Sequence, residues 1–254
     1  MSDTQGIITA AGLGTRMLPV SKEIPKEMLP VPFNGELKPV IQVIFEQLFE
    51  NGLRDFIFVV SKNKRVIEDY FTPDYEFIRF LEMKGKNSQA ESLMSFYKKI
   101  ESSNLAFVNQ NEPRGFGDAV LRAEPYAKDK FLVVAADTIV KDLDISKMKT
   151  NSFLTTRVTD ARNYGVVIAE GDKVIDVEEK PKVPRSNMII VPYYMFDRRI
   201  FSALRGISYS EELQLTCGIR TLIKNGVDFR VVEVSQVYDL GNFNGYAEYV
   251  KQGI

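Results

Sequence analysis

The sequence predicts a three-layer, Rossmann-like α/β fold with a mixed, mainly parallel central sheet. Short apolar runs rich in β-branched residues alternate along the chain with segments of helical period. Strands that are apolar on both faces are typical of a sheet covered by helices on each side. The chain has 254 residues, of which 44% are hydrophobic, so one domain with a large core is expected. Ligands in such folds bind at the carboxyl ends of the strands.

The predicted strands come at intervals along the whole chain. They are G-I-I-T-A from residue 6, F-I-F-V-V from 56, L-A-F-V from 105, F-L-V-V-A-A from 131, I-I-V-P-Y-Y-M-F from 189 and F-R-V-V-E-V from 229. Each run is short and rich in the β-branched and aromatic residues that strands favour.

Two amphipathic segments predict helices with clear ends. One runs from Pro39 to Asn51, with a proline at its start and Gly52 just after its end. The other runs from Glu212 to Asn225 and stops before Gly226. The single cysteine, Cys217, falls within this second helix, and we expect it to be a small core residue.

Two further segments predict additions to the central sheet within a single domain spanning residues 1–254. Residues 62–104 are charged, follow a helical pattern and contain no strand candidate, so a helical insertion is expected there. Between about 153 and 196 the runs alternate in polarity, and G-D-K from residue 171 is typical of a hairpin turn. This part predicts a small antiparallel sub-sheet that binds part of the ligand.

Composition excludes several classes of function. The chain carries 33 Lys and Arg against 34 Asp and Glu, which argues against a surface that follows a nucleic-acid backbone. It has no apolar run long enough to span a bilayer, and M-S-D-T-Q at the start lacks the features of a signal peptide, so a cytoplasmic location is expected. The chain has no histidine, which removes Ser-His and Cys-His nucleophiles. Catalysis must therefore use carboxylates, lysine, arginine, backbone donors or an oxygen-bound metal.

The stretch A-A-G-L-G-T-R-M-L-P, from residue 10, is the first candidate for a functional loop. A glycine turn after a first strand commonly presents backbone N–H groups to a phosphate. The dinucleotide fingerprint needs a glycine where the chain has Met17, and the Walker loop needs Gly-Lys-Ser/Thr where it has Gly14-Thr15-Arg16. What remains is a short glycine turn with nearby cations, which fits either a polyphosphate-binding loop or a tight solvated turn.

With I-P-K-E-M-L-P-V from residue 24, this stretch resembles the signature loop of the sugar-1-phosphate nucleotidyltransferases. The P-K-E-M-L-P variant is most similar to the UTP–glucose-1-phosphate uridylyltransferases. The resemblance continues in order through N-K-R-V-I-E-D-Y-F at 63, Q-N-E-P-R-G-F-G-D-A-V at 110, A-A-D at 135, Y-G-V-V at 164, E-K-P at 179, S-N at 186, E-E-L-Q-L-T at 211 and Y-D-L-G at 238. It implies the nucleotidyltransferase fold, an enzyme that forms UDP-glucose and pyrophosphate from UTP and glucose 1-phosphate, Mg²⁺ as cofactor, and a homo-oligomer, either dimer or tetramer.

The same resemblance implies which residues bind the nucleotide. They are Ala10, Ala11, Gly12, Gly14, Thr15, Glu27, Gln110 and Gly115. Gln110 suits the edge of a pyrimidine because its side chain offers both a donor and an acceptor. Without the resemblance, a polar loop residue is the preferred interpretation.

The resemblance also implies the catalytic, metal-binding and sugar-binding residues. Arg16, Lys26 and Lys180 are the expected catalytic cations, Asp137 and Asp239 the metal ligands, and Gly165, Glu179 and Asn187 the sugar ligands. Asp137 follows the predicted strand F-L-V-V-A-A, and two carboxylates suffice for Mg²⁺, which completes its shell with water and phosphate. Without the resemblance, an aspartate at position 137 is also typical of a helix cap or a turn.

Because of two departures from the family pattern, the identity of the sugar and the identity of the base stay undetermined. Thr138 stands where these uridylyltransferases usually have a second acidic residue, and Pro192 where a glycine is common. The alternatives are a sugar-1-phosphate nucleotidyltransferase that uses dTTP or CTP, and a catalytically silent paralogue that binds nucleotide sugar.

Overall fold

The computed structural model describes residues 4–252. Its helices are α1 (Val40–Glu50), α2 (Arg65–Tyr70), α3 (Tyr75–Met83), α4 (Asn87–Glu101), α5 (Phe116–Ala123), α6 (Arg199–Arg205), α7 (Leu215–Lys224) and α8 (Phe243–Gln252). Its strands are β1 (Gln5–Thr9), β2 (Pro30–Phe33), β3 (Glu36–Pro39), β4 (Asp55–Val60), β5 (Asn104–Asn109), β6 (Lys130–Ala135), β7 (Thr138–Val140), β8 (Ser152–Arg157), β9 (Gly165–Glu170), β10 (Lys173–Glu179), β11 (Met188–Asp197), β12 (Arg230–Glu233) and β13 (Val237–Asp239).

The central sheet has nine strands in the order β5-β4-β1-β6-β11-β8-β12-β10-β9. Strands β5, β4, β1 and β6 are parallel to one another. Strand β11 joins β6 in antiparallel register, and β12 pairs with β8 in parallel. The predicted mixed α/β fold is confirmed. The antiparallel strands expected between 153 and 196 are β8 to β11, and they continue the central sheet.

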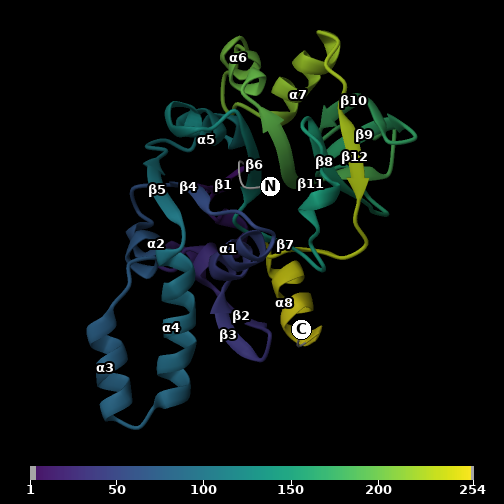
Figure 1. The fold of residues 1–254 in the computed structure, drawn as a ribbon. Helices are drawn as coiled ribbons and strands as arrows, with labels where there is room; N and C mark the ends of the chain where they lie inside the picture. The colour runs from purple at the N-terminus through teal and green to yellow at the C-terminus, as the bar shows by residue number, and fades with distance from the viewer. Residues whose placement is uncertain (1–3, 253–254) are drawn as a thin grey trace.

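Helices cover both faces of this sheet, as Figure 1 shows, because its inner strands are apolar on both sides. In β1, Ile8 packs with the cluster that includes α1, and the neighbouring Ile7 packs with the cluster that includes α5, α6 and α7. The period-two alternation of a strand sends adjacent side chains to opposite faces. The sheet therefore forms the middle layer of three.

Helix α1 matches its predicted span, whereas α7 begins at Leu215 rather than Glu212. The residues before Leu215 are extended because they are held by the turn at Gly115. Leu213 N–H donates to Arg114 O at 2.8 Å, and Leu213 O accepts from Gly117 N–H at 2.8 Å. The expectation that Cys217 is a core residue is wrong, since it lies on the exposed face of α7.

Three helices, α2 to α4, occupy the charged segment between 62 and 104. Helices α3 and α4 form an antiparallel hairpin that projects from the body of the molecule (Figure 1). Over residues 4–252, no helix combines the length and the apolar character that a membrane span requires.

A short two-stranded ribbon positions the last segment of the chain against the end of β6. In this ribbon β13 pairs with β7 in antiparallel register, so that Asp239 lies opposite Thr138. Leu240 N–H also donates to Asp137 O at 2.8 Å. The ladder brings Asp137 and Asp239 together although about a hundred residues separate them in sequence.

Candidate active site

Two pockets with a shared wall lie where β1 and β6 end. The smaller, of about 380 Å³, is lined by residues 11–15 together with Lys26, Gln110 and Gly115, and is called the loop pocket here. The larger, of about 890 Å³, is lined by strand and turn residues that include Gly165, Glu179 and Asp239, and is called the sheet pocket. Asp137 and Lys180 line both pockets and so stand at their junction.

The structure brings most of the predicted site residues to these pockets. The loop pocket is lined by Ala11, Gly12, Gly14, Thr15, Lys26, Glu27, Gln110, Gly115, Asp137 and Lys180. The sheet pocket is lined by Arg16, Asp137, Gly165, Glu179, Lys180 and Asp239.

Two predicted residues do not line either pocket. Ala10 is buried beneath the loop. Asn187 is exposed just before β11, and its Oδ1 accepts a hydrogen bond from Arg157 Nη1 at 3.0 Å. The short S-N motif could not reveal this partner, because Arg157 lies on another strand.

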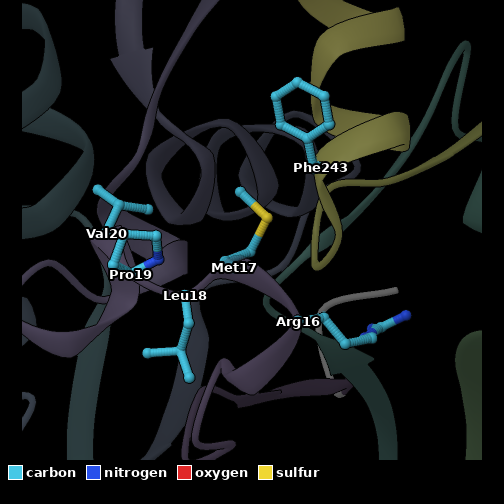
Figure 2. A pocket seen from close by; sticks show the side chains of 6 residues that line it. All are labelled: Arg16, Met17, Leu18, Pro19, Val20 and Phe243. Carbon is cyan, nitrogen blue, oxygen red and sulfur yellow. The ribbon is translucent and has the colours of Figure 1, made fainter.

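The glycine loop is fixed by local contacts on its outer side. Gly14 has φ of 70°, in the left-handed region that favours glycine, and its carbonyl accepts from Ser21 Oγ at 2.7 Å. Figure 2 shows the following segment, Arg16 to Val20, across a pocket of about 420 Å³ from Phe243 at the start of α8. Met17 points into the space between them and is buried. The segment that follows the glycine loop therefore lies beside the start of α8.

Asp137 and Asp239 converge on Gly241. A β-carbon at Gly241 would lie 2.4 Å from Asp137 Oδ2 and 3.0 Å from Asp239 Oδ1. Glycine at this position leaves room for both carboxylates. Two carboxylates, one just before β7 and one at the end of β13, match the oxygen donors that Mg²⁺ prefers, since it usually takes one or two from a protein. Across the described part of the chain, no group of three or more acidic or cysteine side chains gathers around a possible metal.

Each of these carboxylates is paired with one of the predicted catalytic cations. Lys26 Nζ contacts Asp137 Oδ2, and both side chains are nearly buried, at 12% and 14% exposed. Arg16 Nη1 lies 3.0 Å from Asp239 Oδ2, in a more exposed position. The site thus holds two positive and two negative groups in contact.

Burial and the neighbouring charges shift the pKa values of Lys26 and Asp137 in opposite directions. Burial alone lowers the pKa of Lys26, but the carboxylates of Asp137 and Glu27 outweigh it and hold that pKa above its ordinary value. Burial raises the pKa of Asp137, but Lys26 and Arg16 reverse the effect and hold it below its ordinary value. Both groups are therefore charged at neutral pH.

Glu179 and Lys180 occupy the junction between β10 and the turn that follows. Glu179 Oε2 accepts from Thr216 Oγ1 at 2.9 Å, which orients the carboxylate in the sheet pocket. Lys180 has φ of 40°, and its N–H donates to Tyr164 O at 3.0 Å. Thr216 was not among the predicted site residues, although it lies in the quoted motif E-E-L-Q-L-T.

Gln110 is 4% exposed and has a fixed orientation. Its Nε2 donates to Gly115 O at 3.1 Å and to Asp118 Oδ2 at 2.8 Å. These two bonds use both amide hydrogens and leave Oε1 as the polar atom able to bind a ligand. Gly115 has φ of 98°, and a β-carbon there would lie 2.7 Å from Leu213 O, so the turn requires glycine.

Glu27 is 1% exposed, and both of its carboxylate oxygens accept from Lys64 Nζ at 2.8 Å. Sequence reasoning did not select Lys64. The signal that could have found it is its place soon after β4, at the carboxyl edge of the sheet where ligands bind. Contact between Glu27 and a nucleotide stays a prediction.

Replacing Gly241 with alanine is expected to lower turnover at least about tenfold at fixed Mg²⁺, because the new methyl group would push apart the two carboxylates. Higher Mg²⁺ concentrations should restore part of the loss, as measured in a Mg²⁺ titration of the rate. Gly206→Ala is the matched control, since a β-carbon there meets only ordinary contacts at 3.7 and 3.8 Å. Equal Mg²⁺ dependence in both variants would contradict the assignment of the metal site.

Comparison with known proteins identifies relatives along almost the whole chain. The nucleotidyl transferase family matches residues 5–252. A protein of Methanocaldococcus jannaschii is 35% identical over 95% of this chain and 90% of its own length. A UTP–glucose-1-phosphate uridylyltransferase of Streptococcus pyogenes is 32% identical over 95% of this chain and 86% of its own length.

Solved structures of similar shape include proteins with nucleotide bound. The UTP-bound UGPase from Acinetobacter baumannii has a TM-score of 0.85 at 27% identity and covers 99% of this chain and 93% of its own. A UDP-glucose pyrophosphorylase complexed with UDP-glucose has a TM-score of 0.84 at 29% identity and covers 99% of this chain and 98% of its own.

Proposed function

The chain belongs to the nucleotidyl transferase family, and we propose that it is a UTP–glucose-1-phosphate uridylyltransferase, which forms UDP-glucose and pyrophosphate. The observation that carries the proposal is the meeting of two pockets at Asp137 and Lys180. One pocket has the glycine loop and Gln110, which suit a nucleotide, and the other has Glu179, which suits sugar hydroxyls. Relatives named for this reaction, and similar structures holding UTP or UDP-glucose, support the same substrates.

The reaction joins two anions without any proton transfer. A phosphate oxygen of glucose 1-phosphate forms a bond to the α-phosphorus of UTP, and the bond from that phosphorus to the bridging oxygen of the β-phosphate breaks. Pyrophosphate leaves with the electron pair. A phosphate monoester has its second pKa near ~6, so the nucleophile is already ionised at neutral pH. A chain without histidine can therefore perform this chemistry, because no general base is needed.

The protein's task is to place the two anions in line and to neutralise their charge. We assign the N–H groups of the glycine loop, Arg16 and Lys26 to the triphosphate. Lys180 at the junction is assigned to the phosphate of glucose 1-phosphate, and Glu179 to its hydroxyls, with the Gly165 backbone against the sugar. Mg²⁺ held by Asp137 and Asp239 would add positive charge at the α-phosphate. When substrates enter, Lys26 exchanges its carboxylate partner for phosphate oxygens.

The geometry of Gln110 favours uracil over cytosine. Its free Oε1 can accept a hydrogen bond from N3–H of uracil or thymine, whereas N3 of cytosine carries no hydrogen. A site built to bind such a hydrogen discriminates strongly against a base that lacks it. CTP is therefore a poor substrate in this account, and the choice of UTP over dTTP follows the named relatives. Cytoplasmic location and assembly into dimers or tetramers stay predictions.

The proposal is tested by measuring pyrophosphate release with Mg²⁺ for UTP, dTTP, CTP, ATP and GTP, each with several hexose 1-phosphates. We expect UTP with glucose 1-phosphate to give the highest kcat/KM. Addition of EDTA should abolish the rate, and excess Mg²⁺ should restore it. A higher kcat/KM with dTTP would replace the proposal with a thymidylyltransferase, and no release with any pair would indicate a protein that only binds nucleotide sugars.

A further inference from the structure

A buried lysine that has no role in the assignments above lies beneath the glycine loop. Lys64 follows β4, is 7% exposed and comes directly before α2. Its Nζ donates to Ala10 O and Gly12 O, each at 2.7 Å, and to both carboxylate oxygens of Glu27 at 2.8 Å. An ammonium group has three hydrogens, so these partners engage it fully.

The two carbonyl bonds fix the direction in which the loop presents its N–H groups. A trans peptide is planar, and its C=O and the following N–H point in opposite directions. Drawing the carbonyls of Ala10 and Gly12 toward Lys64 therefore turns the N–H groups of Ala11 and Leu13 away from it. Ala11 and Leu13 line the loop pocket, and in residues 4–252 their N–H groups donate to no protein carbonyl.

The bonds to Glu27 fix a second part of the same pocket. Glu27 lies in the short 3-10 turn Lys26–Met28, so anchoring its carboxylate also anchors the backbone that carries Lys26. The positive charge of Lys64 also balances Glu27, which would otherwise be a buried anion next to a polyphosphate site. One side chain thus connects the glycine loop, Glu27 and the backbone of Lys26 in the loop pocket.

We propose that Lys64 is a positioning residue for the nucleotide. It aligns the backbone donors of the glycine loop and, through Glu27, fixes the position of Lys26. The proposal rests on the proposed function, because it assigns the loop pocket to the triphosphate. It requires that loss of Lys64 weaken the use of UTP more than the use of glucose 1-phosphate. A purely structural role would affect both substrates alike.

The test compares the double variant Lys64→Met/Glu27→Gln with Lys38→Met/Glu46→Gln. The first removes Lys64 without leaving a buried charge, and the second removes another buried pair, joined at 2.8 Å, outside both pockets. Thermal unfolding and circular dichroism establish that both are folded. In the first we expect KM for UTP to rise at least about tenfold while KM for glucose 1-phosphate stays within about twofold. In the second we expect both values to stay within about twofold.

A folded Lys64→Met/Glu27→Gln with an unchanged KM for UTP would overturn the proposal, and so would an equal rise in both KM values. If that variant does not fold, Lys64→Arg is measured by the same criteria, because a planar guanidinium cannot place its hydrogens on the same set of acceptors. Calorimetric titration of UTP into wild type and variants separates this inference from the reaction. Absence of pyrophosphate release by wild type rejects the proposed function alone, whereas equal UTP affinity in wild type and variant rejects the role of Lys64.

Discussion

Asp137→Asn is expected to lower turnover by about two to three orders of magnitude while the protein stays folded. Asparagine keeps the shape of the side chain but removes the negative charge that faces Asp239 across Gly241 and pairs with Lys26. The remaining carboxylate would bind Mg²⁺ weakly, so the charge at the α-phosphate would go largely uncompensated. Initial rates of pyrophosphate release at saturating substrates measure the effect.

Asp144→Asn is the matched control for this change. Asp144 comes shortly after Asp137 in the chain, but its side chain is partly exposed and contacts Ser146 and Lys147 outside both pockets. Its turnover should stay within about twofold of wild type, since surface substitutions of this kind have small effects. A folded Asp137→Asn with the turnover of the control would show that Asp137 is not a metal ligand.

Lys26→Met is expected to reduce turnover by a similar factor of about 10² to 10³, through the loss of a cation beside Asp137 in the loop pocket. Lys26 is nearly buried beside Asp137, and its charge acts where water is largely excluded, which strengthens its effect on a phosphate. Methionine retains most of the apolar stem and so preserves packing. Steady-state kinetics should show the loss in kcat, because the interaction is strongest in the transition state.

Lys22→Met tests whether the replacement of any lysine in this segment would lower kcat by the same factor. Lys22 lies four positions earlier, is 78% exposed and, among the described residues, forms its one ion pair with the neighbouring Glu23. Its kcat should remain close to that of wild type. A folded Lys26→Met with wild-type kcat, or an equal loss in both variants, would contradict the role assigned to Lys26.

The fold was predictable where local pattern and tertiary structure agree. The apolar runs of β1, β4 and β6 read as strands because they are buried on both faces, and α1 carries both a helical stripe and clear end signals. The start of α7 was not predictable, because residues before Leu215 are held extended by a turn that is distant in sequence. Cys217 was misplaced for another reason: it lies about 200° around α7 from Leu215, away from the buried stripe of Leu215, Ile219 and Leu222, so the helical period itself indicates an exposed position.

The site residues that could be predicted are those that the motifs of the family resemblance contain. Motifs selected Lys26, Asp137 and Lys180, which all line the loop pocket. They did not select Lys64 or Thr216, whose roles depend on partners 37 positions away in each case, at Glu27 and Glu179. Such pairings arise only when strands that are separate in sequence end at the same edge of the sheet. Lys64 and Thr216 lie in the quoted motifs N-K-R-V-I-E-D-Y-F and E-E-L-Q-L-T, but a motif does not show which distant residue each side chain contacts.

A crystal structure of the protein with UDP-glucose and Mg²⁺ tests whether both pockets serve one reaction at their junction. We expect the diphosphate beside Gly12, Arg16 and Asp137, with uracil against Gln110 and glucose against Glu179. A diphosphate bound elsewhere, with Asp137 and Lys26 still paired to each other as they are here, would contradict this expectation.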